Sequence, residues 1–157
     1  MEIPSLGRRG GGWVVLQLML FGAIAGCGFV GVSWPRSVER FLVIPGLVTA
    51  AAGAVMVALG VASLGSSFTP YPRPLAGAEL RQRGLFKVVR HPVYGGVMLL
   101  GLGWSVAVAP LGLVPVLLLA ALLTMKARRE EAWLDERHAA YASYLARTPR
   151  RFVPWLW

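Results

Sequence analysis

The stretch FLVIPGLVTAAAGAVMVALGVASL, residues 41–64, decides the fold because it contains no charged side chain. A helix rises about 1.5 Å per residue, so a stretch of this length can cross a hydrocarbon layer about 30 Å thick. Three further apolar stretches lie at residues 13–34, 93–109 and 111–125, and the last two meet at Pro110. The sequence therefore predicts an all-α, polytopic membrane protein with four transmembrane helices, the last two forming a helical hairpin.

The composition agrees with a membrane protein rather than a soluble domain. The chain has 157 residues, of which 56% are apolar, and this share exceeds what a soluble domain of that size normally carries. We expect one membrane domain over residues 1–157. Residues 1–64 would form two scaffold helices, and residues 65–157 hold the groups that could carry chemistry.

The distribution of charge predicts the orientation in the membrane. Of the sixteen Lys and Arg residues, only Arg36 and Arg40 fall between the first and second stretches, and fourteen fall on the other side. By the positive-inside rule both termini are cytoplasmic, and a cell inner membrane is the expected location. The net charge of +9 then reflects topology and attraction to lipid headgroups. Membrane lipids are therefore expected partners and nucleic acid is not; no oligomeric state is predicted.

The first two apolar stretches contain nothing polar enough for catalysis. Glycines occur in both, at Gly22, Gly26, Gly46, Gly53 and Gly60, and glycines at such spacings permit close approach of helices. We therefore interpret these helices as scaffold.

Two segments outside the apolar stretches have a distinct character. Residues 65–89 contain three prolines within residues 70–74, so this segment is either a plain cytoplasmic loop or, as we favour, a binding loop. Residues 126–145 have helix formers and aromatic residues at helical spacing, which predicts a separate C-terminal helix at the membrane interface. The tail that follows, with Trp155 and Trp157, is predicted to be a non-catalytic membrane anchor.

Two clusters of ionisable residues lie at the ends of apolar stretches. In the first, His91 and Tyr94 are three residues apart, with Pro92 suited to a first helical turn; an interfacial cap is the alternative interpretation. In the second, Lys126 and Glu130 are four apart and share one helix face, where they could pair or flank a ligand; a solvated ion pair is the alternative. Glu131 points about 100° away from Glu130, so we expect at most one of them to face an inner pocket.

Metal chemistry is poorly supported. The chain has His91, His138 and Cys27 as its only histidines and cysteine, which are too few for a structural zinc site. We predict no metal.

These clusters form part of a longer pattern. The run Arg90-His91-Pro92-x-Tyr94-x-Gly96 is followed about 40 residues later by Glu130-Glu131-x-x-Leu134. An Arg-Gly-Leu-Phe run at residues 83–86 precedes the histidine, and a Tyr-x-x-Tyr at residues 141–144 follows the glutamates. Over roughly residues 67–154 the sequence resembles the superfamily of isoprenylcysteine carboxyl methyltransferases and phospholipid methyltransferases, which are integral membrane enzymes that use S-adenosylmethionine.

The resemblance implies a function and a set of site residues. It implies methyl transfer from S-adenosylmethionine to a lipophilic small-molecule acceptor, whether an isoprenylcysteine-type carboxylate, a lipid amine or a thiol. The implied cofactor-binding residues are Glu79, Leu80, Arg81, Phe86, His91, Pro92, Val93, Tyr94 and Glu130. Lys126 is implied as the catalytic and substrate-binding residue. It stands where the isoprenylcysteine enzymes have an arginine that meets the substrate carboxylate, and lysine keeps the charge but loses the bidentate geometry.

Two other functions stay open at this point. Sterol reductases have a similar C-terminal region and bind a nicotinamide cofactor there, so a membrane reductase that uses NADPH is one alternative. A non-catalytic membrane scaffold, in which both clusters only determine topology, is the other.

Overall fold

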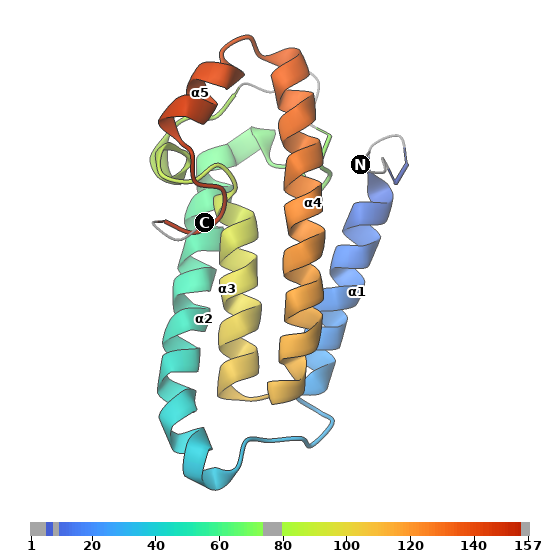
Figure 1. Ribbon diagram of the computed structural model, residues 1–157, viewed down its shortest axis with the longest axis vertical. Helices are drawn as coiled ribbons and strands as arrows, with labels where there is room; N and C mark the ends of the chain where they lie inside the picture. The colour runs from blue at the N-terminus through green and yellow to red at the C-terminus, as the bar shows by residue number, and fades with distance from the viewer. Residues whose placement is uncertain (1–5, 8–9, 74–79, 155–157) are drawn as a thin grey trace.

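The computed structural model describes residues 6–7, 10–73 and 80–154, and these residues form five α-helices and no strand (Figure 1). The helices are α1 (Gly11–Cys27), α2 (Arg36–Leu64), α3 (Pro92–Ala107), α4 (Leu113–Arg137) and α5 (Tyr141–Arg147). Short 3₁₀ turns lie at Gly65–Ser67, Gly84–Lys87 and Pro110–Gly112. Helices α1 to α4 run side by side along the long axis, and α5 lies across one end of this bundle (Figure 1). The predicted all-α class is confirmed.

Two of the helices are long and apolar enough to cross a membrane. They are the segments Arg36–Ser67 and Pro110–Arg137, while α1 and α3 are apolar but shorter, with 17 and 16 residues. Large apolar side chains on the outside of the bundle, such as Met19, Ile44 and Leu117, are more than 60% exposed. Apolar surface of this extent is typical of a membrane-facing protein, because its exposure to water would be unfavourable.

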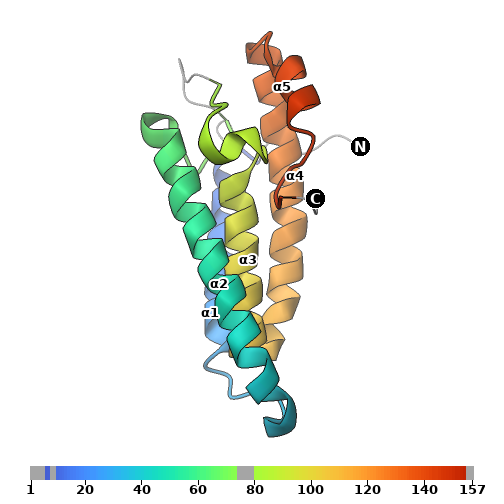
Figure 2. The ribbon, with the colours of Figure 1, turned by 90° about the vertical axis from the view of Figure 1, so that its left-hand side faces the viewer.

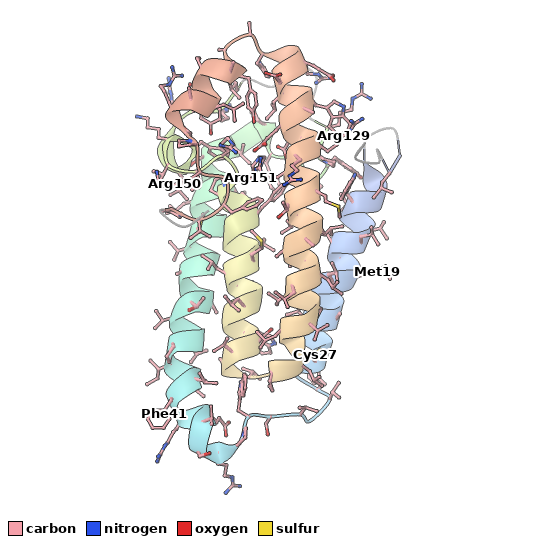
Figure 3. The ribbon with its side chains drawn as sticks, in the orientation of Figure 1. Met19, Cys27, Phe41, Arg129, Arg150 and Arg151 are labelled. Carbon is pink, nitrogen blue, oxygen red and sulfur yellow. The ribbon has the colours of Figure 1, made fainter. Side chains whose placement is uncertain are left out.

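Most charged side chains gather at one end of the bundle. Arg129, Arg150 and Arg151 lie at this end, whereas Phe41 lies near the opposite end, where α2 begins (Figure 3). We call the first end the polar end. It contains the ends of α2 and α4, the beginning of α3, and α5.

The predicted boundaries need two corrections. The stretch 13–34 is not one helix, because α1 ends at Cys27 and glycines at 28 and 31 lead into an extended segment before Pro35 caps α2. The predicted break after residue 125 is also wrong. Helix α4 continues without interruption to Arg137, because residues 126–137 are good helix formers, and α5 begins only at Tyr141.

Glycine contacts hold α2 against α3. A Cβ atom added at Gly46 or Gly53 would lie 2.8 Å or less from backbone atoms of α3, and one added at Gly96 would lie 2.7 Å from Gly53 O. The backbones therefore touch directly, as predicted for Gly46 and Gly53 and also for Gly60, which meets Val93. The same prediction is wrong for Gly22 and Gly26 on α1, where an added Cβ would have no atom within 4 Å.

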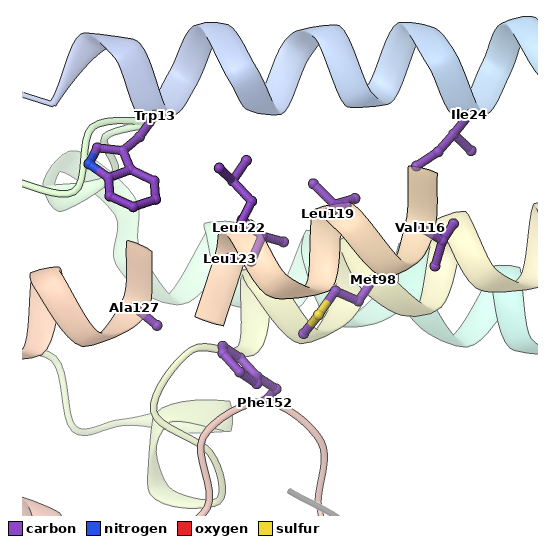
Figure 4. Close-up of a cluster of buried hydrophobic side chains, with 9 residues drawn as sticks. All are labelled: Trp13, Ile24, Met98, Val116, Leu119, Leu122, Leu123, Ala127 and Phe152. Atoms are coloured by element: carbon purple, nitrogen blue, oxygen red, sulfur yellow. The ribbon is translucent and has the colours of Figure 1, made fainter. Parts of the chain in front are cut away.

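The core between α1 and α4 consists of larger side chains. Trp13 and Ile24 of α1 pack with five residues of α4, and Met98 of α3 and Phe152 of the C-terminal tail lie below them (Figure 4). The members of this cluster are Trp13, Ile24, Met98, Val116, Leu119, Leu122, Leu123, Ala127 and Phe152. The tail is thus part of the core.

Candidate active site

The two ionisable clusters of the sequence meet in a pocket at the polar end. Segment 80–91 lies between the end of α2 and the end of α4 (Figure 2), and a cavity of about 90 Å³ lies there. Its walls are Leu64, Ser67, Thr69, Leu80, Arg81, Phe86, Arg90, His91, Glu130, Leu134, His138, Tyr141 and Tyr144. The structure therefore brings His91 and Glu130 to one cavity, although they are far apart in sequence.

His91, Tyr94 and Glu130 form a connected group. The rings of His91 and Tyr94 are stacked, with centroids 5.3 Å apart and planes at 7°. Tyr94 Oη donates a hydrogen bond of 2.8 Å to Glu130 Oε2, and His91 Nδ1 lies 3.8 Å from the same oxygen. Pro92 occupies the first turn of α3, where its missing N–H is not needed, and the turn aims both rings at α4.

Glu131 does not line the pocket, which agrees with the expectation that at most one of the two glutamates would face it, but its carboxylate is bound within the protein. Its Oε1 accepts hydrogen bonds from Arg90 Nε at 2.9 Å and from His91 Nε2 at 3.1 Å. Its Oε2 accepts one from Arg151 Nη2 at 2.8 Å. Glu130 and Glu131 do point in different directions. The C-terminal tail folds back on the side to which Glu131 points and supplies Arg151.

The contact with Glu131 places one proton on the His91 ring. A carboxylate can only accept hydrogen bonds, so Nε2 of His91 carries a proton. In the neutral imidazole Nδ1 is then the nitrogen with the free lone pair, and it lies on the side of Glu130.

The C-terminal tail packs against the beginning of α3 beside the site, so the prediction of a membrane anchor is wrong for its described part. The main-chain N–H groups of Arg90 and His91 donate to the carbonyl oxygens of Arg150 and Arg151, at 3.0 and 2.8 Å. Phe152 is fully buried, with its ring centroid 6.0 Å from that of His91. A side chain at Gly95 would collide with the Phe152 carbonyl. Trp155 and Trp157 lie outside the described residues.

Lys126 lies near the pocket but is not part of its lining. Its side chain is 1% exposed, and Nζ donates hydrogen bonds to Gln17 Oε1 at 2.6 Å and to Pro70 O at 2.9 Å. The ammonium also lies 5.1 Å from the ring centroid of Tyr94. Lys126 and Glu130 therefore contact Tyr94 at different places, Lys126 beside its ring and Glu130 at its hydroxyl group.

Gln17 is a residue that sequence reasoning missed. It lies on α1, which we expected to be scaffold only, and it brings a polar side chain to Lys126 from 109 residues away. A signal was present, because a glutamine is unusual inside an apolar helix and needs a partner there.

The other predicted residues fall at or beside the pocket. Leu80, Arg81 and Phe86 line it, and Pro92 and Val93 line a neighbouring cavity of about 60 Å³ that shares His91 and Glu130. Glu79 lies outside the described residues. The loop expected to bind something contributes Ser67 and Thr69 to the main pocket as well.

Two tyrosines of α5 complete the pocket. Tyr144 Oη donates a hydrogen bond of 2.7 Å to Phe86 O, and burial raises the pKa of Tyr144 to about 12. Burial also raises the pKa of Tyr141, and its buried hydroxyl group has no hydrogen-bond partner among the residues that the structure describes. Sequence reasoning noted their Tyr-x-x-Tyr spacing without assigning them to the site.

Comparison with known proteins identifies the family. The family model for phospholipid methyltransferases matches residues 41–140. The chain belongs to this family, and the match includes the histidine cluster and both glutamates. Membership indicates a methyltransferase, and together with the two long apolar helices it indicates a membrane protein.

A curated relative has a different activity in its name. The chain is similar to Delta(14)-sterol reductase TM7SF2 of Mus musculus, with 34% identity over 85 residues, which is 52% of this chain and 20% of the relative. The match therefore spans only about a fifth of that protein's length.

Proposed function

We propose that the protein transfers a methyl group from S-adenosylmethionine to a lipophilic acceptor at the cytoplasmic face of a membrane. The observation that carries this proposal is the meeting of His91, Tyr94 and Glu130 at one cavity, within a chain of the phospholipid methyltransferase family. In this proposal all four helices α1 to α4 cross the membrane and the polar end is cytoplasmic.

The residues of the pocket fit the chemical groups of S-adenosylmethionine. Glu130 offers a carboxylate, 26% exposed, that suits the ammonium group, and Arg81 offers a cation that suits the carboxylate. Phe86, Tyr141 and Tyr144 supply aromatic surface for the adenine, and the buried Tyr141 hydroxyl group needs a hydrogen-bond partner that a ligand can provide.

The pocket must enlarge to hold this ligand. Its volume of about 90 Å³ is below the ~300–1,000 Å³ that is usual for small-molecule sites. The outer wall consists of α5 and the segment around Phe86. Since α5 follows the helix break at residues 138–140, we propose that α5 moves outward when the cofactor enters.

When bound, the cofactor supplies an electrophilic methyl group on a sulfonium sulfur. Displacement at this carbon requires alignment of the reacting atoms and exclusion of water more than it requires a strong acid or a metal. The residues of this chain provide these conditions. Glu130 and Tyr94 orient the bound ligand, and the tail that packs against His91 closes the site on the side of α3.

An apolar cavity of about 420 Å³ offers a route for the acceptor from the bilayer. It lies toward the middle of the bundle and is lined by Phe21, Ile24, Ala25, Ala50, Val97, Leu100, Gly101, Trp104 and Leu119. We call it the apolar groove. Tyr94 is one helical turn from Val97, so the groove ends next to the polar pocket, and a hydrocarbon chain lying in it would present its head to that pocket.

Titration of the purified protein with S-adenosylmethionine and with NADPH tests the proposal. We expect S-adenosylmethionine to bind, and Glu130→Gln to weaken that binding by about 1–3 kcal/mol, the range for loss of a charged hydrogen bond. Glu136→Gln is the matched control, because Glu136 is exposed on the same helix. No binding of S-adenosylmethionine would contradict the function, and an unchanged affinity in Glu130→Gln would remove Glu130 from the site.

A membrane reductase is the second candidate, favoured by the similarity to the sterol reductase. The same titration decides between the two. NADPH binding that excludes S-adenosylmethionine would establish the reductase, and binding of neither ligand would leave only the membrane scaffold.

A further inference from the structure

The ammonium group of Lys126 has three partners among the residues that the structure describes. An ammonium group has three N–H donors. Two of them are used by Gln17 Oε1 and Pro70 O, and the face of the Tyr94 ring, 5.1 Å away, stabilises the positive charge. Because Lys126 is 1% exposed, a further group gains contact with its ammonium group most directly by replacing one of these three.

The three partners differ in how easily they can be replaced. Pro70 offers a main-chain carbonyl oxygen, which cannot rotate away by itself. Tyr94 is fixed at two places, by the stacked ring of His91 and by the hydrogen bond to Glu130. Gln17 is a flexible, half-buried side chain on α1. It is therefore the partner that can be exchanged.

Gln17 also lies near the end of the apolar groove where the head group of an acceptor would be placed. It is one helical turn from Phe21, which lines the apolar groove, and Lys126 is about two turns from Leu119, which lines it as well. Tyr94 is one turn from Val97 of the groove. Gln17, Tyr94 and Lys126 thus lie beyond the groove on the side of the polar end.

We infer that Gln17 determines which acceptors are admitted, because its amide oxygen occupies the position on Lys126 that an oxygen of the acceptor's head group takes. This inference rests on the proposed function, in which the groove holds the acceptor's hydrocarbon chain. The ligand class is an amphiphile whose head carries an anionic oxygen. An amine head is disfavoured at this position, because Lys126 repels a second cation in a buried site.

Two substitutions of Gln17 with opposite expected effects test the inference. The full-length protein in a non-ionic detergent is titrated with dodecanoate and, as the cationic control, with dodecyltrimethylammonium. Gln17→Leu removes the competing oxygen, so dodecanoate should bind about tenfold tighter than to the wild type. Gln17→Glu places a carboxylate on Lys126, so dodecanoate should bind about tenfold weaker. Lys126→Met should bind dodecanoate no better than the cation.

Controls separate this role from a structural one. Leu18→Ala, a neighbouring position that is 60% exposed, should leave dodecanoate binding unchanged. If Gln17 only connects α1 to α4, Gln17→Leu should weaken dodecanoate binding, and Gln17→Glu should bind dodecanoate about as tightly as the wild type. This result would overturn the inference. Should Gln17→Leu not fold, Gln17→Asn takes its place, because its shorter amide does not reach Lys126 and must tighten dodecanoate binding if the inference holds.

The proposed function is measured separately on the same preparations. Binding of S-adenosylmethionine by the wild type, together with no change of dodecanoate affinity in either Gln17 variant, would refute the role of Gln17 alone. Absence of S-adenosylmethionine binding would refute the proposed function.

Discussion

The middle of the bundle and its polar end are stabilised in opposite ways. In the middle, α2 and α3 touch through glycines, and the contact is made by backbone atoms without charge. At the polar end, Glu131 joins α4 to the beginning of α3 and to the tail through Arg90, His91 and Arg151. An atom added at the glycines between α2 and α3 would collide with the facing backbone. Removal of the Glu131 charge would leave the buried cations at the polar end without their carboxylate.

This difference shows how a membrane bundle can carry a polar site. Helices in lipid gain little from burying apolar side chains against each other, so close backbone contact supplies the attraction in the middle. Buried charges need complete sets of partners, and those partners come from segments distant in sequence. The middle thus provides a rigid support, and the polar end provides the chemistry.

Removal of the charge at Glu131 should break the polar end and give the largest effect. Glu131→Gln leaves the guanidinium of Arg90, which is 8% exposed, without its carboxylate. We expect the free energy of unfolding in mixed micelles to fall by about 3–5 kcal/mol, the range for breaking a buried ion pair. A loss below about 1 kcal/mol would show that the main-chain oxygens of Thr148 and Pro149 suffice for Arg90. Glu136→Gln on the exposed face is the control.

Added volume at Gly53 should break the middle of the bundle. A Cβ there would lie 2.6 Å from Gly96 O, so Gly53→Val forces α2 and α3 apart. We expect a loss of about 1–3 kcal/mol in the same unfolding measurement, the range for overpacking. Gly22→Val is the matched substitution on α1, where an added Cβ meets nothing, and it should change stability by less than about 0.5 kcal/mol. Equal effects of the two substitutions would refute the glycine-contact interpretation.

Loss of the Tyr144 hydroxyl group should have a smaller effect, and this effect should depend on pH. Tyr144→Phe removes the hydrogen bond to Phe86 O and should cost about 1 kcal/mol at pH 7. Because burial raises the pKa of Tyr144 to about 12, its protonated form is favoured in the folded protein. This stabilisation is present below about pH 10, the usual tyrosine pKa, and is lost as the pH rises towards 12. The difference between wild type and Tyr144→Phe should therefore shrink over that range, and a constant difference would contradict the assignment.

Much of the fold could be predicted because apolar length and glycine spacing are local properties of the sequence. The hairpin at Pro110 and the glycines of α2 are examples. The end of α4 could not be located in this way. Residues 126–137 favour a helix whether they leave the membrane or continue the preceding helix, and hydropathy alone suggested a boundary that the backbone does not have.

The site was predictable where a motif joins two segments, and it was not predictable where a contact depends on tertiary structure. The arrangement of His91 with Glu130 agrees with the pattern in the sequence. The set of partners of Glu131 depends on a tail that folds back, and no local periodicity encodes this return. The partner of Gln17 lies on another helix, so its side chain alone gave no indication of Lys126.

The return of the tail has a consequence for biosynthesis. The segment that packs beside His91 comprises residues 148–153, which the ribosome makes after helices α1 to α4. Helices α1 to α4 can therefore form during translation, while the site is still incomplete. In a nascent chain the start of α3 lacks these partners until residues 148–153 leave the exit tunnel, so the surroundings of His91 are completed only after the four helices have been made.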